Sequence, residues 1–450
     1  MKRFLPLIAG FQLAFEVNCR AAANHRFNIE DYGATGNGVS LDTVAVNKAI
    51  DACAAAGGEV VFPPGRFVCG TLHLRSHVSL YLEAGARIIG TTNLDSYVAP
   101  AVPSFMPEAK WGKWHRALLV GENLEDVSIS GAGVIDGNKV FDPAGEEKMR
   151  GPHTIAFVNC RGFRITDISI IDSANYAIFF QASDDVSIRN VTITGGWDGV
   201  HFRGAPKHWC HHISITDCRF YTGDDSIAGR YWDDTVISGC SINSSCNGIR
   251  LIGPATHLTV NHCLFAGPGR EPHRSSNRTN MLSGINLQPG GWDKTEGPLD
   301  DVFLADNAMK GVASPLTIST RGDNPISRIT VAGLNATGVY RSALSVESWA
   351  EAPITNVTFR NVSVEFEGGG KASQANQSVS KPGVDARPLP AWALYARNVE
   401  LLLLEDVRFS FHFEDQRPVI LAEGVRKLEM DDVKFPRLDA VPEPVMQRSK

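Results

Sequence analysis

Three stretches of the chain decide its fold: ISITDCRF at 213–220, TVISGCSI at 235–242 and LTVNHCLF at 258–265. Their starts lie 22 and 23 residues apart, and FRITDISI at 163–170 and VSIRNVTI at 186–193 repeat the pattern upstream. Each stretch reads as short alternating strands broken by a polar turn. A period near 23 residues is too long for a hairpin and too short for a strand–helix–strand unit. It suits one coil of a parallel β-solenoid, whose aliphatic columns fill a continuous core.

Similar short stretches of alternating apolar residues extend the predicted solenoid from about residue 59 to about residue 435. We therefore predict an all-β fold, a single right-handed parallel β-helix over 24–437, followed by a C-terminal tail over 438–450. The segment 40–56 reads as a helix, because Ser40 or Asp42 can cap it and the glycines at 57–58 end it. A solenoid needs its open ends covered, so this helix is expected to cap the N-terminal end of the core.

The N-terminus has the order of a signal peptide: Lys2 and Arg3, a short apolar run at 4–15, and three alanines at 21–23. We therefore predict a signal peptide over 1–23 and a secreted or periplasmic protein. The apolar run is too short to span a bilayer and no later stretch qualifies, so no membrane span is expected.

The composition limits the kinds of partner that the chain is expected to bind. The net charge is −6 and no basic block is present, which argues against a nucleic-acid partner. Of nine cysteines, Cys218, Cys240 and Cys263 follow the repeat at intervals of 22 and 23, which favours stacked core thiols over disulfides. No C-x-x-C pair suggests zinc, so neither a metal nor a cofactor is expected. We expect a monomer.

The repeat register also places acidic side chains. Asp198, Asp225 and Asn247 take one outward position on three successive coils, and Asp224 lies beside this column. Adjacent parallel strands lie about 4.8 Å apart, so stacked carboxylates repel and at least one pKa should rise. Structure alone gives no reason for such stacking. Paired carboxylates, one as acid and one activating water, are what glycoside hydrolysis requires.

A plainer interpretation is that Asp-Gly and Gly-Asp are ordinary turn pairs. The aspartate pairs at 184–185, 233–234 and 300–301 stand at the starts of segments, and we interpret those as turns. For the cluster around Asp224 we favour a functional role, since stacked like charges mark functional sites.

The same residues carry a resemblance to polygalacturonase-type glycoside hydrolases, family 28 among the pectin-active β-helix proteins. WDG at 197–199 resembles that family's Asn-Thr-Asp motif, and GDD at 223–225 resembles its Gly-Asp-Asp motif. DYGATGNG at 31–38 and VVFPPG at 60–65 are similar to its N-terminal region. The likeness covers roughly 28–350.

The resemblance implies an inverting hydrolase, with Asp224 as general acid and with Asp198 and Asp225 holding the attacking water. Inverting enzymes keep acid and base about 6.5–9.5 Å apart to admit that water. A spacing of one coil plus one residue is compatible with this separation.

The chain departs from the family pattern at two motifs. The family's His-Gly position reads Asn247-Gly248, and its Arg-x-Lys strand reads GINLQ, which places Asn286 and Gln288 where two cations belong. Amides hydrogen-bond hydroxyls but do not neutralise a carboxylate. Plain polygalacturonan is therefore a doubtful substrate.

Two stretches interrupt the period, 267–282 and 368–389, and are expected as loops bordering a groove, where specificity usually lies. The first carries four basic side chains: Arg270, His273, Arg274 and Arg278. If this loop folds over the groove, His273 or Arg274 can take the missing roles, and Arg250 is a further candidate. The alternative is that these charges only solvate the loop.

Two more residues are candidate substrate contacts. His201 shares a predicted strand with Asp198, although a single histidine is more often a structural hydrogen-bonder than a catalyst. Trp197 belongs to a group of aromatics near the active coils whose rings can stack on sugar faces or cover the solenoid edge.

We therefore predict a secreted glycoside hydrolase that inverts configuration at O-glycosidic bonds of a plant-type or pectic, uronic-acid-containing polysaccharide or oligosaccharide. One alternative is a β-helix polysaccharide lyase, which uses Arg or Lys as base and often Ca²⁺. Another is a non-catalytic carbohydrate-binding or adhesin-type solenoid, motivated by the missing His, Arg and Lys.

Overall fold

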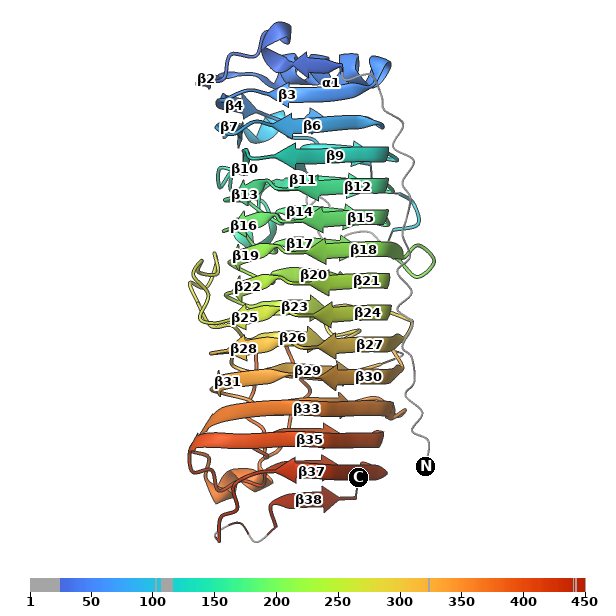
Figure 1. The fold of residues 1–450 in the computed structure, drawn as a ribbon, viewed down its shortest axis with the longest axis vertical. Coiled ribbons are helices and arrows are strands. Elements are labelled where there is room, and N and C mark those ends of the chain that lie inside the picture. Colours follow the sequence, from blue (N-terminus) through green and yellow to red (C-terminus); the bar gives the residue numbers. More distant parts are fainter. Residues whose placement is uncertain are drawn as a thin grey trace, which may run out of the picture.

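The structure is a computed structural model that describes residues 25–101, 103–106, 116–322, 324–439, 441 and 443–449. The signal peptide predicted over 1–23 lies outside the described residues. Figure 1 shows short strands stacked coil upon coil along one axis, with helix α1 (Thr43–Ala56) at one end. Neighbouring coils pair in parallel. The all-β, right-handed parallel β-helix predicted from the repeat is confirmed.

One face of the stack is a 13-stranded sheet in the described part of the chain, which we call sheet B. Its strands are β5 (Leu72–His73), β8 (Ala117–Glu122), β11 (His153–Val158), β14 (Ile178–Gln181), β17 (Val200–Arg203), β20 (Ile227–Arg230), β23 (Asn247–Leu251), β26 (Ser283–Leu287), β29 (Leu316–Thr320), β32 (Leu344–Ser348), β34 (Leu394–Arg397), β36 (Ile420–Glu423) and β38 (Val445–Arg448).

The other strands form sheet A, to which most coils contribute two strands. They are β1 (Arg26–Asn28), β2 (Asn37–Leu41), β3 (Gly58–Phe62), β4 (Gly65–Cys69), β6 (Val78–Leu82), β7 (Ala86–Gly90), β9 (Glu125–Gly131), β10 (Val134–Asp136), β12 (Arg161–Thr166), β13 (Ser169–Ile171), β15 (Asp184–Arg189), β16 (Thr192–Thr194), β18 (Cys210–Thr216), β19 (Arg219–Thr222), β21 (Trp232–Ser238), β22 (Ser241–Ser244), β24 (Ala255–Asn261), β25 (Leu264–Ala266), β27 (Leu299–Ala305), β28 (Ala308–Lys310), β30 (Ile326–Ala332), β31 (Asn335–Val339), β33 (Ile354–Gly368), β35 (Val399–Phe413) and β37 (Lys427–Lys434).

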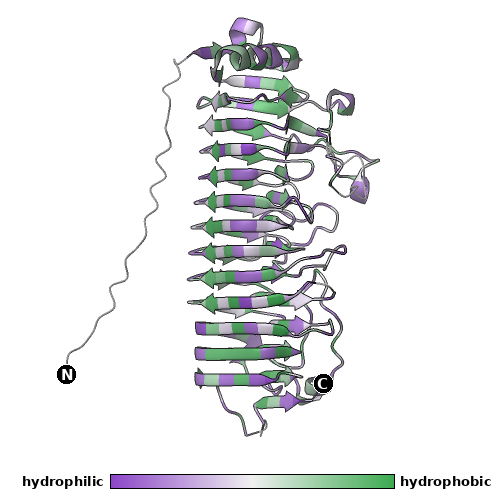
Figure 2. Cartoon of the chain, turned by 90° about the vertical axis from the view of Figure 1, so that its right-hand side faces the viewer, coloured by the Kyte–Doolittle hydropathy of each residue, from purple (hydrophilic) through white to green (hydrophobic). Residues whose placement is uncertain are grey.

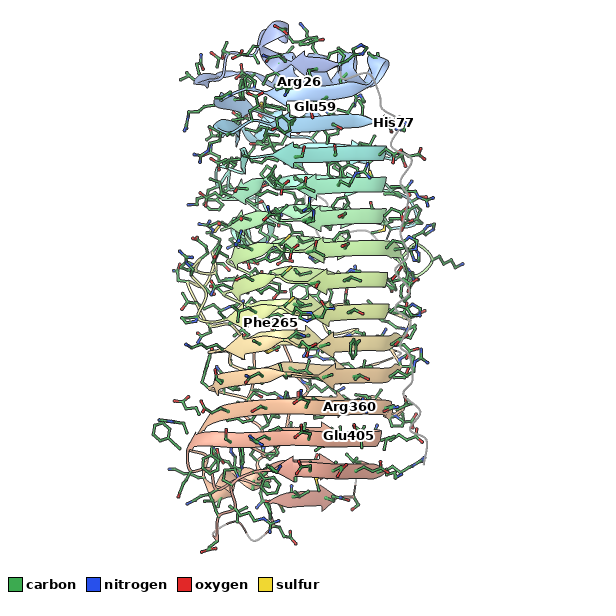
Figure 3. The ribbon with its side chains drawn as sticks, viewed as in Figure 1. Arg26, Glu59, His77, Phe265, Arg360 and Glu405 are labelled. Atoms are coloured by element: carbon green, nitrogen blue, oxygen red, sulfur yellow. The ribbon has the colours of Figure 1, made fainter. Side chains whose placement is uncertain are left out.

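The core consists of side-chain columns that run along the axis. Ile215, Ile237 and Val260 pair from coil to coil and are fully buried. Phe265, labelled in Figure 3, continues a parallel column from Ile242. Figure 2 shows the resulting alternation of apolar and polar residues along the strands. The period read from the sequence is therefore the register of the sheets.

The thiols follow the same register. Cys218, Cys240 and Cys263 lie one above another, and each thiol donates to backbone carbonyls of its own coil and of the coil before. All eight cysteines of the described residues are buried and unpaired. Stacked core thiols, rather than disulfides, are confirmed for this part of the chain.

The N-terminal helix caps the core as predicted but begins later. It spans Thr43–Ala56, buries Val46, Ala49 and Ile50 among its residues, and ends at Gly57 with a φ of 73°. The Asp42 carboxylate does not cap it, because that group accepts hydrogen bonds from the backbone N–H of Thr35 (2.7 Å) and from the Thr35 hydroxyl (3.0 Å). Asp42 therefore fixes the preceding turn to the helix.

The C-terminal segment also differs from expectation. Part of the segment 438–450, expected as a tail, forms strand β38, which pairs with β36 through Ile420 and Val445. Exposed ion pairs join neighbouring coils nearby, such as Arg360 on β33 with Glu405 on β35 (Figure 3). The sheet B face thus continues almost to the end of the described chain.

Long connections border sheet B. Segments 137–152, 267–282 and 369–393 precede strands β11, β26 and β34, and segment 288–298 follows β26. Figure 2 shows long loops projecting from one side of the stack. The 369–393 loop is held to the solenoid by an ion pair between Arg387 and buried Glu347. These loops flank the face on which the aspartate column lies.

A second row of charged residues follows one corner of the solenoid. At that corner one residue per coil has a positive φ, and we call this row the corner ladder. It comprises His77 (Figure 3), Asp126, Gly162, Asp185, His212, Asp234, His257, Asp301 and Arg328. Acidic and basic side chains alternate along most of it. The Asp pairs interpreted as turn residues each place their second member in this row.

Contacts along the corner ladder join successive coils. His212 Nδ1 lies 2.8 Å from Asp185 Oδ1, and its Nε2 lies 3.9 Å from Asp234 Oδ2. His257 Nε2 lies 3.9 Å from Asp301 Oδ2. Its Nδ1 lies 2.7 Å from Asp233, and this hydrogen bond raises the pKa of His257. The ladder alternates in charge only where its histidines are protonated.

Candidate active site

A pocket of about 370 Å³ lies over sheet B at strands β17, β20 and β23. The three predicted aspartates Asp198, Asp224 and Asp225 line it. Its walls come from the loops at 137–152, 267–282, 288–298 and 369–393. The basic lining residues are Arg150, Arg203, Arg250, Arg278, His201 and His273. A carboxyl cluster thus meets a cationic wall.

The aspartate column is fixed by sheet register. Val200 pairs with Ile227 and Ile227 with Ile249, which brings Asp198, Asp225 and Asn247 to equivalent positions on three coils. All three are buried, Asp198 with 5% of its surface exposed and Asn247 with none. The column is present as predicted, but loops cover it, so it lies at the bottom of a pocket.

Asp225 is held by the third step of the column. The Asn247 backbone N–H and side-chain amide both donate to Asp225 Oδ1, at 3.0 and 2.8 Å. Arg250 Nη1 donates to Oδ2 at 3.4 Å. Asn247, which replaces a histidine of the resembled family, therefore orients a carboxylate.

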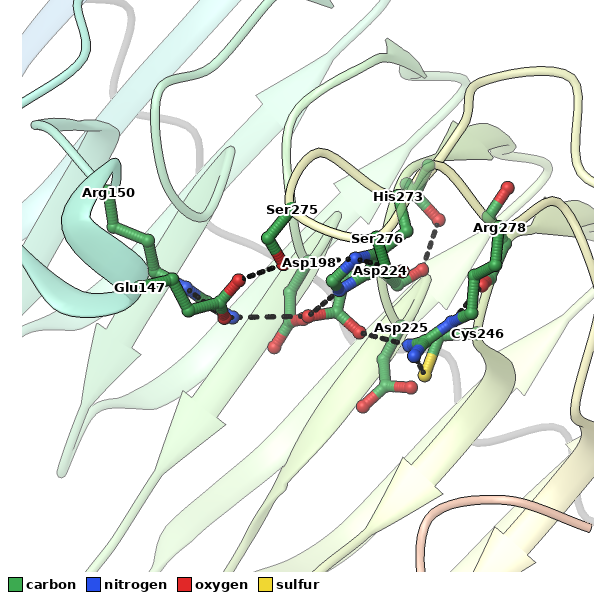
Figure 4. Close-up of polar contacts among 12 residues, drawn as sticks. Glu147, Arg150, Asp198, Asp224, Asp225, Cys246, His273, Ser275, Ser276 and Arg278 are labelled. Atoms are coloured by element: carbon green, nitrogen blue, oxygen red, sulfur yellow. Dashed lines mark hydrogen bonds and ion pairs between the residues drawn. The ribbon is translucent and has the colours of Figure 1, made fainter.

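Asp224 is surrounded by cations (Figure 4). Arg150 Nη2 donates to Asp224 Oδ2 at 3.2 Å, and His273 Nε2 lies 3.7 Å from the same oxygen. Arg278 Nη2 lies 4.0 Å from Oδ1. Burial raises the pKa of Asp224, but the His273 hydrogen bond and the Arg150 charge outweigh it and hold that pKa below its usual value.

Asp198 has the opposite electrostatics. Burial, and then the charges of Asp224 and Asp225, raise its pKa well above the usual value. Its Oδ2 lies 2.7 Å from His201 Nδ1. Two carboxyls of one cluster thus differ in proton affinity, which is the arrangement that acid–base chemistry needs.

Arg150, Glu146 and Glu147 line the pocket and were missed in the sequence. They belong to the 137–152 connection, and Arg150 bridges Glu147 to Asp224. The length of one coil of the repeat could have revealed this connection. Phe163 pairs with Val127, 36 residues earlier, so one coil is longer than the usual 23 or so. An extended coil beside the aspartate column marks a wall of the pocket.

The 267–282 loop supplies the pocket with His273 and Arg278. Arg274 does not line it, because its guanidinium binds Asp172 (3.3 Å) on a neighbouring coil. Arg270 instead stacks on Tyr221, 4.6 Å from the ring centre. The Ser275 hydroxyl donates to Glu147, which joins this loop to the 137–152 connection (Figure 4).

Asn286 and Gln288 are absent from the described lining of the pocket. The Asn286 amide donates to Asn247 Oδ1 at 3.4 Å, and the Gln288 amide donates to Gly383 O at 3.1 Å. The first hydrogen bond supports Asn247, the third residue of the aspartate column, and the second holds the 369–393 loop to strand β26 and its following turn. These hydrogen bonds give both amides partners within the protein.

The aromatic candidates divide between core and rim. Trp197 is fully buried and lies beneath Arg150, whose guanidinium carbon is 5.2 Å from the ring centre. Trp292 lines the pocket with 52% of its surface exposed, and Arg250 lies over its ring at 5.5 Å. Trp292, not Trp197, is the ring that a sugar can reach.

Asp224, Asp225 and Cys246 are close enough to one another to hold a metal ion, with ligand atoms within 4.8 Å. Their chemistry does not suit one. Burial and the two aspartates raise the pKa of Cys246, so its thiol stays protonated. Arg278 Nη2 already contacts the sulfur at 3.1 Å. Arg278 and Arg250 therefore contact the atoms that would have to bind the ion.

The chain has relatives among pectin-degrading enzymes. It is 27% identical over 232 residues to a probable polygalacturonase of Vitis vinifera, covering 48% of this chain and 46% of that protein. It is 28% identical over 254 residues to an exo-poly-alpha-D-galacturonosidase of Dickeya chrysanthemi, covering 44% and 41%. The chain therefore spans less than half the length of either relative. No helix in the described parts of the chain is long and apolar enough to cross a membrane.

Solved structures share the fold. An exopolygalacturonase of Thermotoga maritima matches with a TM-score of 0.58 and 19% identity, over 76% of this chain and 87% of that one. PfbA, a surface adhesin of Streptococcus pneumoniae, matches with the same TM-score and 16% identity, over 90% and 93%. The fold alone thus does not separate an enzyme from an adhesin.

A family model supplies the assignment. The model described as "Rhamnogalacturonase A/epimerase, pectate lyase-like" matches residues 26–250, half of the chain. This region contains strands β1 to β22, most of β23, the aspartates Asp198, Asp224 and Asp225, and Arg150. The resemblance to polygalacturonase-type, pectin-active β-helix proteins drawn from the motifs is confirmed. The chain belongs to the rhamnogalacturonase A/epimerase, pectate lyase-like family.

Proposed function

We propose that this chain is an exported glycoside hydrolase that cleaves O-glycosidic bonds in a pectic, uronic-acid-containing polysaccharide or oligosaccharide. The buried carboxyl cluster carries the proposal. Asp198 and Asp224 lie in one pocket, and their surroundings push their pKa values in opposite directions. Glycoside hydrolysis needs one carboxyl protonated and one ionised at the same pH.

The roles follow the motif resemblance and give inversion. Asp198 and Asp225 orient a water, and Asp198 takes its proton as the water oxygen bonds to the anomeric carbon. The bond from that carbon to the glycosidic oxygen breaks, and Asp224 protonates the leaving oxygen. Each bond cleaved consumes one water, and the enzyme's protons return by exchange with solvent.

The cationic wall favours an acidic sugar. Arg150, Arg203, Arg250 and Arg278 supply guanidinium groups from two loops and two strands. Strand β26 with the residue after it, which corresponds to the Arg-x-Lys strand of the resembled family, has only amides at those positions. Guanidinium groups bind carboxylates through paired hydrogen bonds. The Trp292 ring at the rim is placed to stack on a sugar face. The names of the two curated relatives point to the same substrate class.

The charge of the substrate also affects the protonation of Asp224, the proposed general acid. The surroundings favour the reverse of these roles before a sugar binds: burial raises the pKa of Asp198, and Arg150 and His273 favour ionised Asp224, whereas a general acid must carry a proton. A uronate carboxylate bound to the guanidinium groups offsets their charge and raises the proton affinity of Asp224. A bound uronate therefore favours the protonated form of Asp224 that catalysis needs, whereas a neutral sugar does not.

The test is product analysis on homogalacturonan, rhamnogalacturonan and their carboxyl-reduced forms. We expect reducing ends from the acidic polymers, inverted configuration in the first product by NMR, and loss of activity in Asp224→Asn. The carboxyl-reduced polymers should be cleaved far more slowly. Equal cleavage of both forms would contradict the role given to substrate charge.

The same assay separates the alternatives. A polysaccharide lyase would yield UV-absorbing unsaturated ends without consuming water, and a chelator would usually stop it. A carbohydrate-binding solenoid would bind glycan and leave it intact on long incubation. Either outcome replaces the hydrolase proposal.

Export and a monomeric state belong to this proposal. A pectic polymer is too large to enter a cell, and the predicted signal peptide provides the route. Light scattering and cell fractionation test the two statements.

A further inference from the structure

His201 is the polar neighbour that holds Asp198. Its Nδ1 lies 2.7 Å from Asp198 Oδ2, and both side chains are almost fully buried. The imidazole stacks on Tyr176, with ring centres 4.5 Å apart and planes 7° apart, and meets the ring of Phe179 at 81°. These rings fix the imidazole plane, so the direction of its hydrogen bond is fixed as well.

Arg203 determines which nitrogen of His201 carries the proton. Arg203 Nη2 lies 3.4 Å from His201 Nε2, and a guanidinium only donates hydrogen bonds. His201 Nε2 must therefore accept. Burial lowers the pKa of His201 well below its usual value, and Arg203 and Arg230 lower it further, so the ring is neutral. A neutral ring that accepts at Nε2 has its proton on Nδ1.

We propose that His201, held in its Nδ1–H tautomer by Arg203, is a positioning residue that sets the orientation and proton affinity of Asp198. The Nδ1–H donates to Asp198 Oδ2. Among the described residues Asp198 Oδ1 has no hydrogen-bond partner, so this oxygen is left for the proton of the attacking water. The inference rests on the proposed hydrolytic function, in which Asp198 acts as a base.

The hydrogen bond from His201 favours ionised Asp198, whereas burial and the neighbouring carboxylates favour its protonated form. Asp224 and Asp225 repel a charge on Asp198, while Arg150 and Arg250 attract it. A hydrogen bond to the ionised form favours that form. Without His201 the carboxyl would keep its proton to higher pH, and fewer molecules would have an active base. From the sequence, His201 is a candidate substrate contact or a structural hydrogen-bonder; the geometry gives it a different task, the positioning of Asp198.

The experiment compares His201→Leu with His201→Asn. Leucine removes the donor, whereas the Asn amide can donate from nearly the position of Nδ1. The profile of kcat/KM against pH is measured on a glycan that the wild type cleaves. In His201→Leu we expect the acidic limb to move up by about one pH unit, a loss of about tenfold on that limb. His201→Asn should return the limb towards the wild type.

His153→Asn is the matched control. His153 lies on the other side of Tyr176, with ring centres 5.1 Å apart, and its Nδ1 accepts the Tyr176 backbone N–H at 3.2 Å. Asparagine can accept that hydrogen bond, so the variant removes a buried imidazole without removing the donor to Asp198. Its acidic limb should stay in place.

Two outcomes overturn the inference. One is a folded His201→Leu protein, with wild-type thermal unfolding, whose acidic limb has not moved. The other is a ¹H–¹⁵N NMR spectrum that shows the His201 proton on Nε2. The NMR measurement needs no activity, so a wild type that cleaves no glycan defeats the proposed function and leaves the tautomer to be judged by itself.

Discussion

Two rows of aspartates follow the same solenoid at the same spacing, in opposite surroundings. In the pocket, Asp198 and Asp225 are stacked without an opposite charge between them and are almost fully buried. On the corner ladder, Asp234 and Asp301 alternate with histidines, and more than half of each side chain is exposed. The repeat gives both rows the same regularity, and only one of them forms a site.

The difference shows what turns a column of carboxylates into a site. Exposed charges that alternate cost little and contribute little. Buried like charges are strongly unfavourable unless opposite charges come from elsewhere. In the pocket these come from extended coils: Arg150 from 137–152, and His273 and Arg278 from 267–282. The repeat supplies the carboxylates, and the interruptions of the repeat supply their counter-charges.

The largest expected effect is loss of activity from a single pocket carboxylate. Asp225→Asn should lower kcat/KM by on the order of 10³-fold, because the neutral amide no longer helps Asp198 to orient the attacking water. Asp234→Asn makes the same change on the corner ladder and should leave kcat/KM within about twofold. Steady-state kinetics on an acidic glycan measures both. Equal losses would mean that burial of the row does not matter.

The next effect is on stability. Arg150→Met takes a buried cation away from the buried carboxylate of Asp224 and from the partly exposed Glu147, which should lower the free energy of unfolding by about 3 kcal/mol. The control is Arg161→Met, since Arg161 is exposed and pairs with Asp185 at the corner ladder. Urea unfolding of the two variants should show a clear shift only for the first. A stable Arg150→Met protein would contradict the role given to the cationic wall.

A smaller effect concerns substrate affinity and pH. Burial raises the pKa of Glu146 to about 7, against the opposing charge of Arg150. Below that pH Glu146 is neutral, and above it the carboxylate repels an acidic sugar. KM for an acidic glycan should therefore rise by about threefold between about pH 6 and about pH 8. Glu146→Gln should abolish the rise. A KM that climbs equally in the variant would assign the effect to another group.

The smallest effect belongs to the corner ladder. The folded-state pKa of His257 is raised, so its contribution to stability is fully present below the unfolded pKa of about 6.5 and is lost as pH rises through the folded value. Solvent screening keeps it to at most about 0.5 kcal/mol. The gain in melting temperature between about pH 8 and about pH 5 should be slightly smaller in His257→Gln than in the wild type. High salt should remove the difference.

Sequence reasoning located the fold and the carboxyl column because both depend on register. Once Val200, Ile227 and Ile249 are known to stack, the position of Asp198 relative to Asp225 follows from counting residues. Counting also located the loop at 267–282. Each strand pairs in a fixed register with the strand of the next coil, so residue positions can be predicted coil by coil without knowing the paths of the loops.

The walls of the pocket could not be found by counting. His273 lies in the pocket, but Arg274 points to Asp172, and Arg278 contacts Asp224 instead. The path of an aperiodic loop decides which of two nearby arginines reaches the pocket. Asp42 shows the same limit on a small scale, because its carboxylate binds Thr35 and leaves the helix uncapped.

The stacked thiols have a practical consequence. Every described cysteine is buried and unpaired, so the native protein offers none of these sulfurs to a thiol reagent. Their labelling requires the coils to open. If the stack opens as one unit, these cysteines become reactive together; if it frays from an end, Cys53 and Cys69 near the capping helix react before Cys240 in the middle. The order in which these native cysteines react therefore shows where unfolding begins.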